Sequence, residues 1–123
     1  MESHGQIKLE WDKDILVLKA TGPFNLEGMM DALNQIRESV NTANQASWKR
    51  LTILDTESLG SIETVGIMKQ NYIWTKTHGC TATAVVVRST FQTEIFDEIA
   101  NGDSKQKTFM NEEDARTWLS SQE

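Results

Sequence analysis

Short apolar stretches with strand periodicity alternate along this chain with longer stretches of helical periodicity, and this order constrains the fold more than any single motif. The strand-like stretches are residues 7–11, 15–18, 51–54, 80–87 and 105–110, and the helix-like ones are residues 26–40, 61–78, 91–99 and 112–119. Strands that alternate with helices need right-handed crossovers and form a mostly parallel sheet. We therefore predict an α/β domain with a mixed, mostly parallel sheet of about five strands and about four helices.

Local signals mark where these elements begin and end. Only the polar turn 12–14 separates the first two strand stretches, which predicts an N-terminal β-hairpin. Asn25 is a good N-cap for the first helix, and residues 41–47 read as the polar loop that follows it. Asp55 ends the third strand, and Gly79 closes the second helix.

The bulk properties of the chain limit its partners and its compartment. Its 123 residues fit one domain, residues 1–123, in which we expect residues 1–5 to be disordered. A net charge of -6 without a basic cluster argues against nucleic acid and against an anionic membrane surface. No apolar run is long enough for membrane insertion, and a single cysteine, Cys80, fits a reducing compartment, so we expect a cytoplasmic protein.

Several segments lie in an order that is typical of one known family. Leu54-Asp55 ends a strand, and Ile62-Glu63-Thr64-Val65-Gly66 follows at the start of the second helix. Gly22-Pro23-Phe24-Asn25 leads into the first helix, and Asn111-Glu112-Glu113-Asp114-Ala115 leads into the last. In these features the chain resembles the STAS (sulfate transporter and anti-sigma-factor antagonist) family, as a diverged STAS-like bacterial member. The resemblance covers nearly the whole chain.

The resemblance implies a non-enzymatic regulatory domain that binds a protein partner, such as a regulator or a kinase-like protein. Family members are switched by phosphorylation of a hydroxyl residue at the start of the second helix, and the matching position here is Thr64. This chain departs from the family pattern, because Glu63 stands where the family has Asp and Val65 where it has a second hydroxyl residue. The alternative is that Thr64 is an ordinary first-turn residue.

The second helix has more apolar residues than one face can bury. Ile67 and Trp74 are seven residues apart, close to the line of Glu63, and lie away from the side that we expect to pack on the sheet. These three residues are our partner-binding candidates, with a homodimer contact and a foreign partner as equal possibilities. The other interpretation is that a neighbouring element covers them.

A second function from a different class is the binding of a small apolar ligand or a lipid. Phe24, Met29 and Met30 are the candidates to line a flexible apolar pocket between the first helix, the second helix and the sheet. Methionines at helical spacing also occur as ordinary core residues, so both interpretations stay open.

The remaining polar residues do not form a recognisable catalytic set. Asp55, Glu57 and Glu63 fall near one edge of the predicted sheet, but without defined ligand spacing they are more typical of helix capping and solvation than of a metal site. His78 and Cys80 flank a glycine, and we interpret both as structural. We expect no catalytic residues, no metal and no cofactor, and a protein that is not an enzyme.

Overall fold

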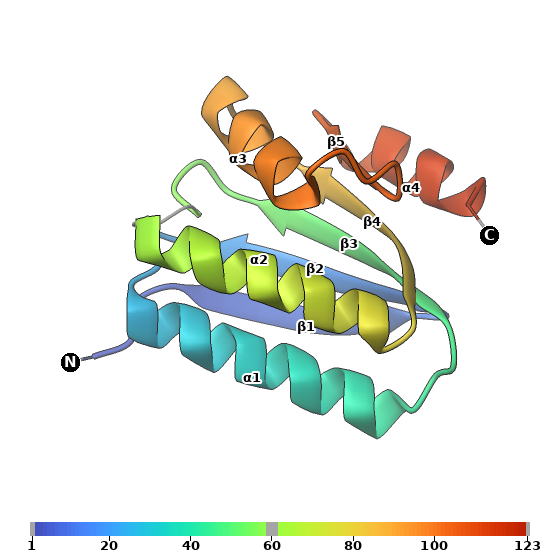
Figure 1. Ribbon diagram of the computed structural model, residues 1–123, viewed down its shortest axis with the longest axis horizontal. Coiled ribbons are helices and arrows are strands. Elements are labelled where there is room, and N and C mark those ends of the chain that lie inside the picture. Colours follow the sequence, from blue (N-terminus) through green and yellow to red (C-terminus); the bar gives the residue numbers. More distant parts are fainter. Residues whose placement is uncertain (1, 59–61, 123) are drawn as a thin grey trace.

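The computed structural model describes residues 2–58 and 62–122. In chain order the elements are β1 (Gln6–Asp12), β2 (Ile15–Thr21), α1 (Leu26–Ala43), β3 (Trp48–Leu54), α2 (Ile62–Thr77), β4 (Cys80–Val86), α3 (Thr90–Ala100), β5 (Gln106–Phe109) and α4 (Glu112–Ser120). Figure 1 shows α1 and α2 lying side by side along the sheet. The predicted number and order of strands and helices are confirmed.

The strands form one sheet in sequence order, β1-β2-β3-β4-β5. β1 and β2 pair antiparallel as the predicted hairpin, whereas β2, β3, β4 and β5 pair in parallel. The predicted mixed, mostly parallel sheet is therefore confirmed. Its parallel strands all end at one edge, where the chain enters the crossover helices.

The sheet separates two hydrophobic clusters. The larger one joins one sheet face to helices α1, α2 and α3, and the smaller one joins the other face to α4. Alternation along β3 divides its side chains between them, because Trp48 and Leu54 belong to the larger cluster and Leu51 to the smaller one. The three-helix side is where the candidate site lies.

The end of helix α1 differs from the prediction. Asn25 caps α1 as expected, since its Oδ1 accepts from the Gly28 N–H at 2.8 Å. The helix then continues to Ala43, three residues into the predicted loop, because nothing breaks it before Asn44 adopts a left-handed conformation. The predicted helix start at Ser61 lies outside the described residues.

The N-terminal segment was expected to be disordered, but residues 2–5 contact the start of α1. The His4 N–H donates to Asn25 Oδ1 at 2.9 Å, and Asn25 Nδ2 donates to the Glu2 carbonyl at 2.8 Å. Gly28 allows this contact, because a Cβ at that position would lie 1.7 Å from the His4 carbonyl oxygen. One amide side chain thus caps the helix and holds the segment before β1.

Candidate functional site

A cavity of about 60 Å³ lies between the sheet and the three helices α1, α2 and α3. Most of the side chains around it are apolar, and they come from every layer that encloses it. The apolar ones are Ile7, Leu18, Ala20, Phe24, Met29, Ala32, Leu33, Ile36, Leu54, Met68, Val85, Phe96 and Ile99. Polar groups enter it from β3, α2, β4 and β5, so the cavity combines an apolar wall with a polar region.

Two of the three predicted pocket residues line this cavity. Phe24 and Met29 are buried and belong to its wall. Met30 was wrongly assigned to the pocket, since it is 49% exposed and is not among the lining residues. The reason is helical geometry: each residue turns the side-chain direction by about 100°, so Met29 and Met30 cannot both face the sheet.

The polar region of the cavity is centred on Arg50 of β3. Its Nε donates to Thr52 Oγ1 at 2.9 Å, and its Nη1 donates to Asn71 Oδ1 at 2.7 Å. Among the described residues no carboxylate forms an ion pair with this guanidinium. Desolvation by burial lowers the pKa of Arg50, while the nearby Cys80 acts in the opposite direction. The Arg50 side chain is thus half-buried, and its charge has no counter-charge among the described residues.

Asn71 of α2 completes this polar region. Its side chain is 2% exposed, and its Oδ1 accepts the hydrogen bond from Arg50. Its Nδ2 is buried and donates to no atom of the described residues. A buried amide N–H without a partner costs roughly 1–3 kcal/mol, so native proteins rarely retain one without a purpose.

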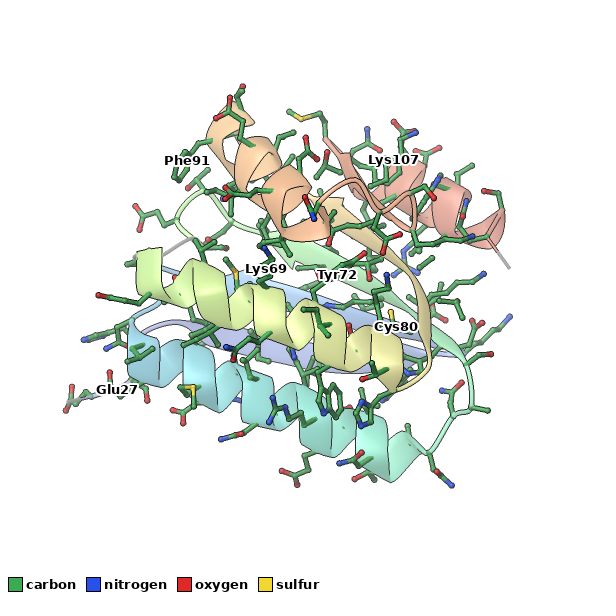
Figure 2. All side chains as sticks on the ribbon, viewed as in Figure 1. Glu27, Lys69, Tyr72, Cys80, Phe91 and Lys107 are labelled. Carbon is green, nitrogen blue, oxygen red and sulfur yellow. The ribbon has the colours of Figure 1, made fainter. Side chains whose placement is uncertain are left out.

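Other polar groups around the cavity already have partners. The Tyr72 hydroxyl donates to Asp103 Oδ2 at 2.7 Å, and Lys76 pairs with the same carboxylate. These contacts hold the pKa of Asp103 at about 2, and burial together with Asp103 raises the pKa of Tyr72. Figure 2 shows Tyr72 on the side of α2 that faces α3. Gln106 Nε2 donates to the Phe96 carbonyl at 2.6 Å. Among the described residues, Asn71 Nδ2 is the buried side-chain donor without a partner, and the Arg50 guanidinium keeps N–H groups beyond the two that bond to Thr52 and Asn71.

The phosphorylation that the family resemblance implies would need Thr64 at the surface, but Thr64 is buried. It stands in the first turn of α2, as predicted, but its exposed fraction is 0%. The buried side of this helix runs through Thr64, Met68, Asn71 and Thr75, and three of these are polar. A prediction of the buried side of α2 from its apolar residues alone therefore places that side at the wrong angle around the helix. A kinase would reach Thr64 only after the start of α2 moves.

The three partner-binding candidates differ in exposure. Glu63 is exposed, whereas Ile67 and Trp74 are half-buried and pack against the larger cluster. The Trp74 ring stacks on His78 with centroids 4.0 Å apart, and the Arg37 guanidinium of α1 lies 5.5 Å from its centre. Helix α1 thus covers part of the surface that the sequence left open, and the partner role of these residues stays a prediction.

The acidic residues near the sheet edge act in local structure. Asp55 Oδ1 accepts from the Ser58 hydroxyl at 2.6 Å and from the backbone N–H groups of Gly22 and Glu57. Partial burial opposes ionisation of this carboxyl, but the hydrogen bonds outweigh it and lower the pKa of Asp55. Within residues 2–58 and 62–122, no three His, Cys, Asp or Glu side chains gather as a metal site would require.

His78 and Cys80 do not form a nucleophile pair. His78 Nδ1 lies 2.7 Å from the Trp74 carbonyl oxygen, whereas the Cys80 thiol contacts the Ala82 carbonyl and Thr83 Oγ1. Burial raises the pKa of Cys80, which favours the unreactive thiol over the thiolate.

Sequence reasoning missed Arg50 and Asn71 altogether. The third strand was started at Leu51, although it begins at Trp48. A signal was present: Trp48, Arg50, Thr52 and Leu54 alternate with Lys49, Leu51 and Ile53, which places Arg50 on the same sheet face as a buried tryptophan. Asn71 had no comparable signal, because a polar residue in a helix normally faces solvent.

Comparisons with known proteins identify the fold. The sequence matches no family model and no curated protein. The structure is similar to that of an uncharacterized protein of the DUF3478 family from Shewanella loihica PV-4, which is described as having a SpoIIAA-like fold. The two agree with a TM-score of 0.64 over 97% of this chain and 96% of that chain, at 16% sequence identity.

The chain has a SpoIIAA-like fold. The STAS-like architecture that the sequence predicted is confirmed by this similarity. At 16% identity the SpoIIAA-like fold is all that the two proteins are shown to share, so a function has to be argued from the site itself. None of the helices in the described part of the chain combines the length and apolar character needed to cross a membrane.

Proposed function

We propose that this protein is a ligand-binding domain of SpoIIAA-like fold that holds a small, largely apolar molecule between its sheet and helices α1, α2 and α3. The observation that carries the proposal is the cavity of about 60 Å³, with Phe24 and Met29 in its wall and Arg50 and Asn71 in its polar region. Ligand sites typically combine an apolar lining with a few placed polar groups.

The energetic argument starts from packing. Protein interiors are close-packed, and each cavity lowers stability because its lining loses dispersion contacts. Here the cavity also holds a charged guanidinium and an unpaired amide, both of which cost further free energy in an apolar surrounding. A domain selected for stability alone would fill such a space with aliphatic side chains, so we infer that occupation by a ligand offsets the cost.

The lining also supports binding without catalysis. The described lining residues include no His, Cys, Asp or Glu, which are the usual acids, bases and nucleophiles. Ser58 is buried and donates to the Asp55 carboxylate and to the Ala20 carbonyl, so its hydroxyl is used in local structure. Tyr72 also lines the cavity, but its hydroxyl already donates to Asp103, so the lining side chains are suited to enclose and orient a molecule.

We propose protein interaction through the outer surface of α2 as the second candidate function. Partial accessibility of Trp74, with an arginine over its ring, supports it, because aromatic and arginine side chains are enriched at interfaces. Ile73, beside it in sequence, is 55% exposed. The surface also includes Glu63 and Ile67, and either a foreign partner or a second copy of the chain would suit it.

Thermal unfolding with a panel of small organic compounds tests the first proposal. A compound that binds the folded state stabilises it by RT ln(1 + [L]/Kd), so Tm rises with the logarithm of the compound concentration once that concentration exceeds Kd. Four- to eight-carbon acids, alcohols and amines form the panel, and native mass spectrometry of the purified protein checks for a co-purified molecule. We expect at least one class to raise Tm with this logarithmic dependence on its concentration.

Two variants of α1 make that test specific. Ala32 is buried in the cavity wall, so Ala32→Leu should fill the space and abolish the Tm response while the fold is kept. Asn34→Leu adds the same side chain to the exposed surface of α1 and should leave the response intact. Absence of any response in the wild type, with no bound molecule detected, would refute the proposal.

A further inference from the structure

We propose that the ligand of this cavity is a short-chain monocarboxylate whose carboxylate binds to Arg50 and Asn71 and whose hydrocarbon chain lies against the apolar wall. This inference rests on the proposed ligand-binding function and specifies the chemical class of the ligand. The argument uses the unused donors of the polar region, its charge and the size of the cavity.

The donors match a carboxylate. Arginine carries five N–H groups in a planar fork, and the hydrogen bonds from Arg50 to Thr52 and Asn71 use one on Nε and one on Nη1. Both N–H groups of Nη2 donate to nothing among the described residues. The Asn71 amide lies next to the guanidinium, and its Nδ2 is the buried donor without a partner. A carboxylate has two oxygens to accept from these two groups.

The charge of the lining selects a monoanion. Arg50 is the single charged side chain among the described lining residues, and it has no ion-pair partner there. A guanidinium stays protonated in proteins, so it needs an anion rather than a shifted protonation state to become neutralised. One carboxylate would balance it, whereas a phosphate dianion would leave an excess negative charge in an apolar surrounding.

The size of the cavity limits the chain length. A single water needs about 10–15 Å³ of cavity volume, so a cavity of about 60 Å³ has room for roughly four to six waters. A four- to six-carbon acid matches such a space, and a long-chain fatty acid exceeds it. Ile36, Val85 and Phe96 are among the apolar side chains that the hydrocarbon chain would contact.

Isothermal titration calorimetry with sodium hexanoate, hexan-1-ol, hexyl phosphate and sodium decanoate tests the proposal. We expect hexanoate to bind the wild type at least tenfold more tightly than each of the other three. Arg50→Met should reduce hexanoate affinity at least tenfold. Lys49→Met removes the same charge from the neighbouring residue, whose side chain bonds to the Leu119 carbonyl on the opposite face, and should leave hexanoate binding within twofold of the wild type.

A second variant keeps the test decisive if Arg50→Met does not fold. Asn71→Asp has nearly the same shape but places a resident carboxylate beside the guanidinium, so it should compete with hexanoate and abolish its binding. Equal affinity for hexanoate and hexan-1-ol, unchanged in both variants, would overturn the carboxylate assignment and leave the apolar-ligand function standing. Equal loss in Lys49→Met would also overturn the assignment. Failure of every compound to bind would overturn the proposed function as well.

Discussion

Removal of the polar pair from the cavity should stabilise the ligand-free protein. The double variant Arg50→Met/Asn71→Leu replaces a desolvated guanidinium and an unpaired amide with apolar side chains of similar size. The wild type keeps two hydrogen bonds from a charged donor, worth roughly 1.5–3 kcal/mol each. Two costs oppose this stabilisation. Desolvation of the guanidinium costs several kcal/mol, and the unpaired amide costs about 1–3 kcal/mol.

The double variant also buries more apolar surface, which stabilises the folded state by roughly 25 cal/mol for each Å² buried. With these terms combined, we expect the free energy of unfolding to rise by about 1–4 kcal/mol, as is found when buried charged groups are replaced by apolar ones. Each single variant should instead lower stability by about 1–3 kcal/mol, because it leaves the other polar side chain without its partner. The four proteins therefore form a double-mutant cycle with a large coupling energy.

Urea unfolding followed by tryptophan fluorescence and far-UV circular dichroism measures all four proteins without added ligand. The predicted order of midpoints is double variant, wild type, then the two single variants. A double variant less stable than the wild type by more than about 1 kcal/mol would refute the reasoning. That result would mean that the polar pair stabilises the apo fold, and the argument that it is retained for a ligand would be lost.

Four further outcomes follow from the same structure. Thr64→Asp should lower the free energy of unfolding by about 3 kcal/mol in urea melts, because it buries a charge in a fully enclosed position; an unchanged midpoint would show that the start of α2 opens easily. Glu63→Lys, on the exposed surface, should leave stability within about 0.5 kcal/mol, so that its effect on capture of a protein partner reports the α2 surface alone. Gly28→Ala should destabilise the protein and speed proteolysis before β1, since its Cβ would meet the His4 carbonyl; equal cleavage rates would contradict this. Hydrogen bonds from Lys76, the Lys105 backbone and Tyr72 lower the pKa of Asp103 from its usual 3.8 to about 2, so its stabilising contribution is complete above pH 4 and is lost as pH falls towards 2. Asp103→Asn should flatten the dependence of stability on pH between 4 and 2, and an unchanged dependence in that range would contradict the assignment.

The fold was largely predictable from sequence because periodicity reports which faces are buried. The alternation of Ile7, Leu9 and Trp11, the helical spacing that runs from Met29 to Val40, and the cap at Asn25 all agree with the structure. Boundaries were less accurate where no breaker residue marks the end, as in α1 beyond Val40.

The candidate site was predictable only in its apolar part. Phe24 and Met29 could be found because apolar residues near a helix start point to the core. Asn71 is a buried polar residue and Arg50 a half-buried charged one, whereas sequence rules that assign polar residues to solvent place both on the surface. The same rule misplaced Thr64, because α2 buries a largely polar face. Local rules failed at the positions that the proposed function uses, which is where such failures are expected.

The most direct test of a carboxylate held by Arg50 and Asn71 is nuclear magnetic resonance of the ¹⁵N-labelled protein during titration with sodium hexanoate. The donor signals to follow are the Nδ2 protons of Asn71 and the guanidinium protons of Arg50. We predict that both move downfield and exchange more slowly with water as the cavity fills, while the Lys49 signals do not move. If the Met29 methyl signal shifts but the two donor signals stay in place, a ligand enters without its carboxylate reaching Arg50, and the account is wrong.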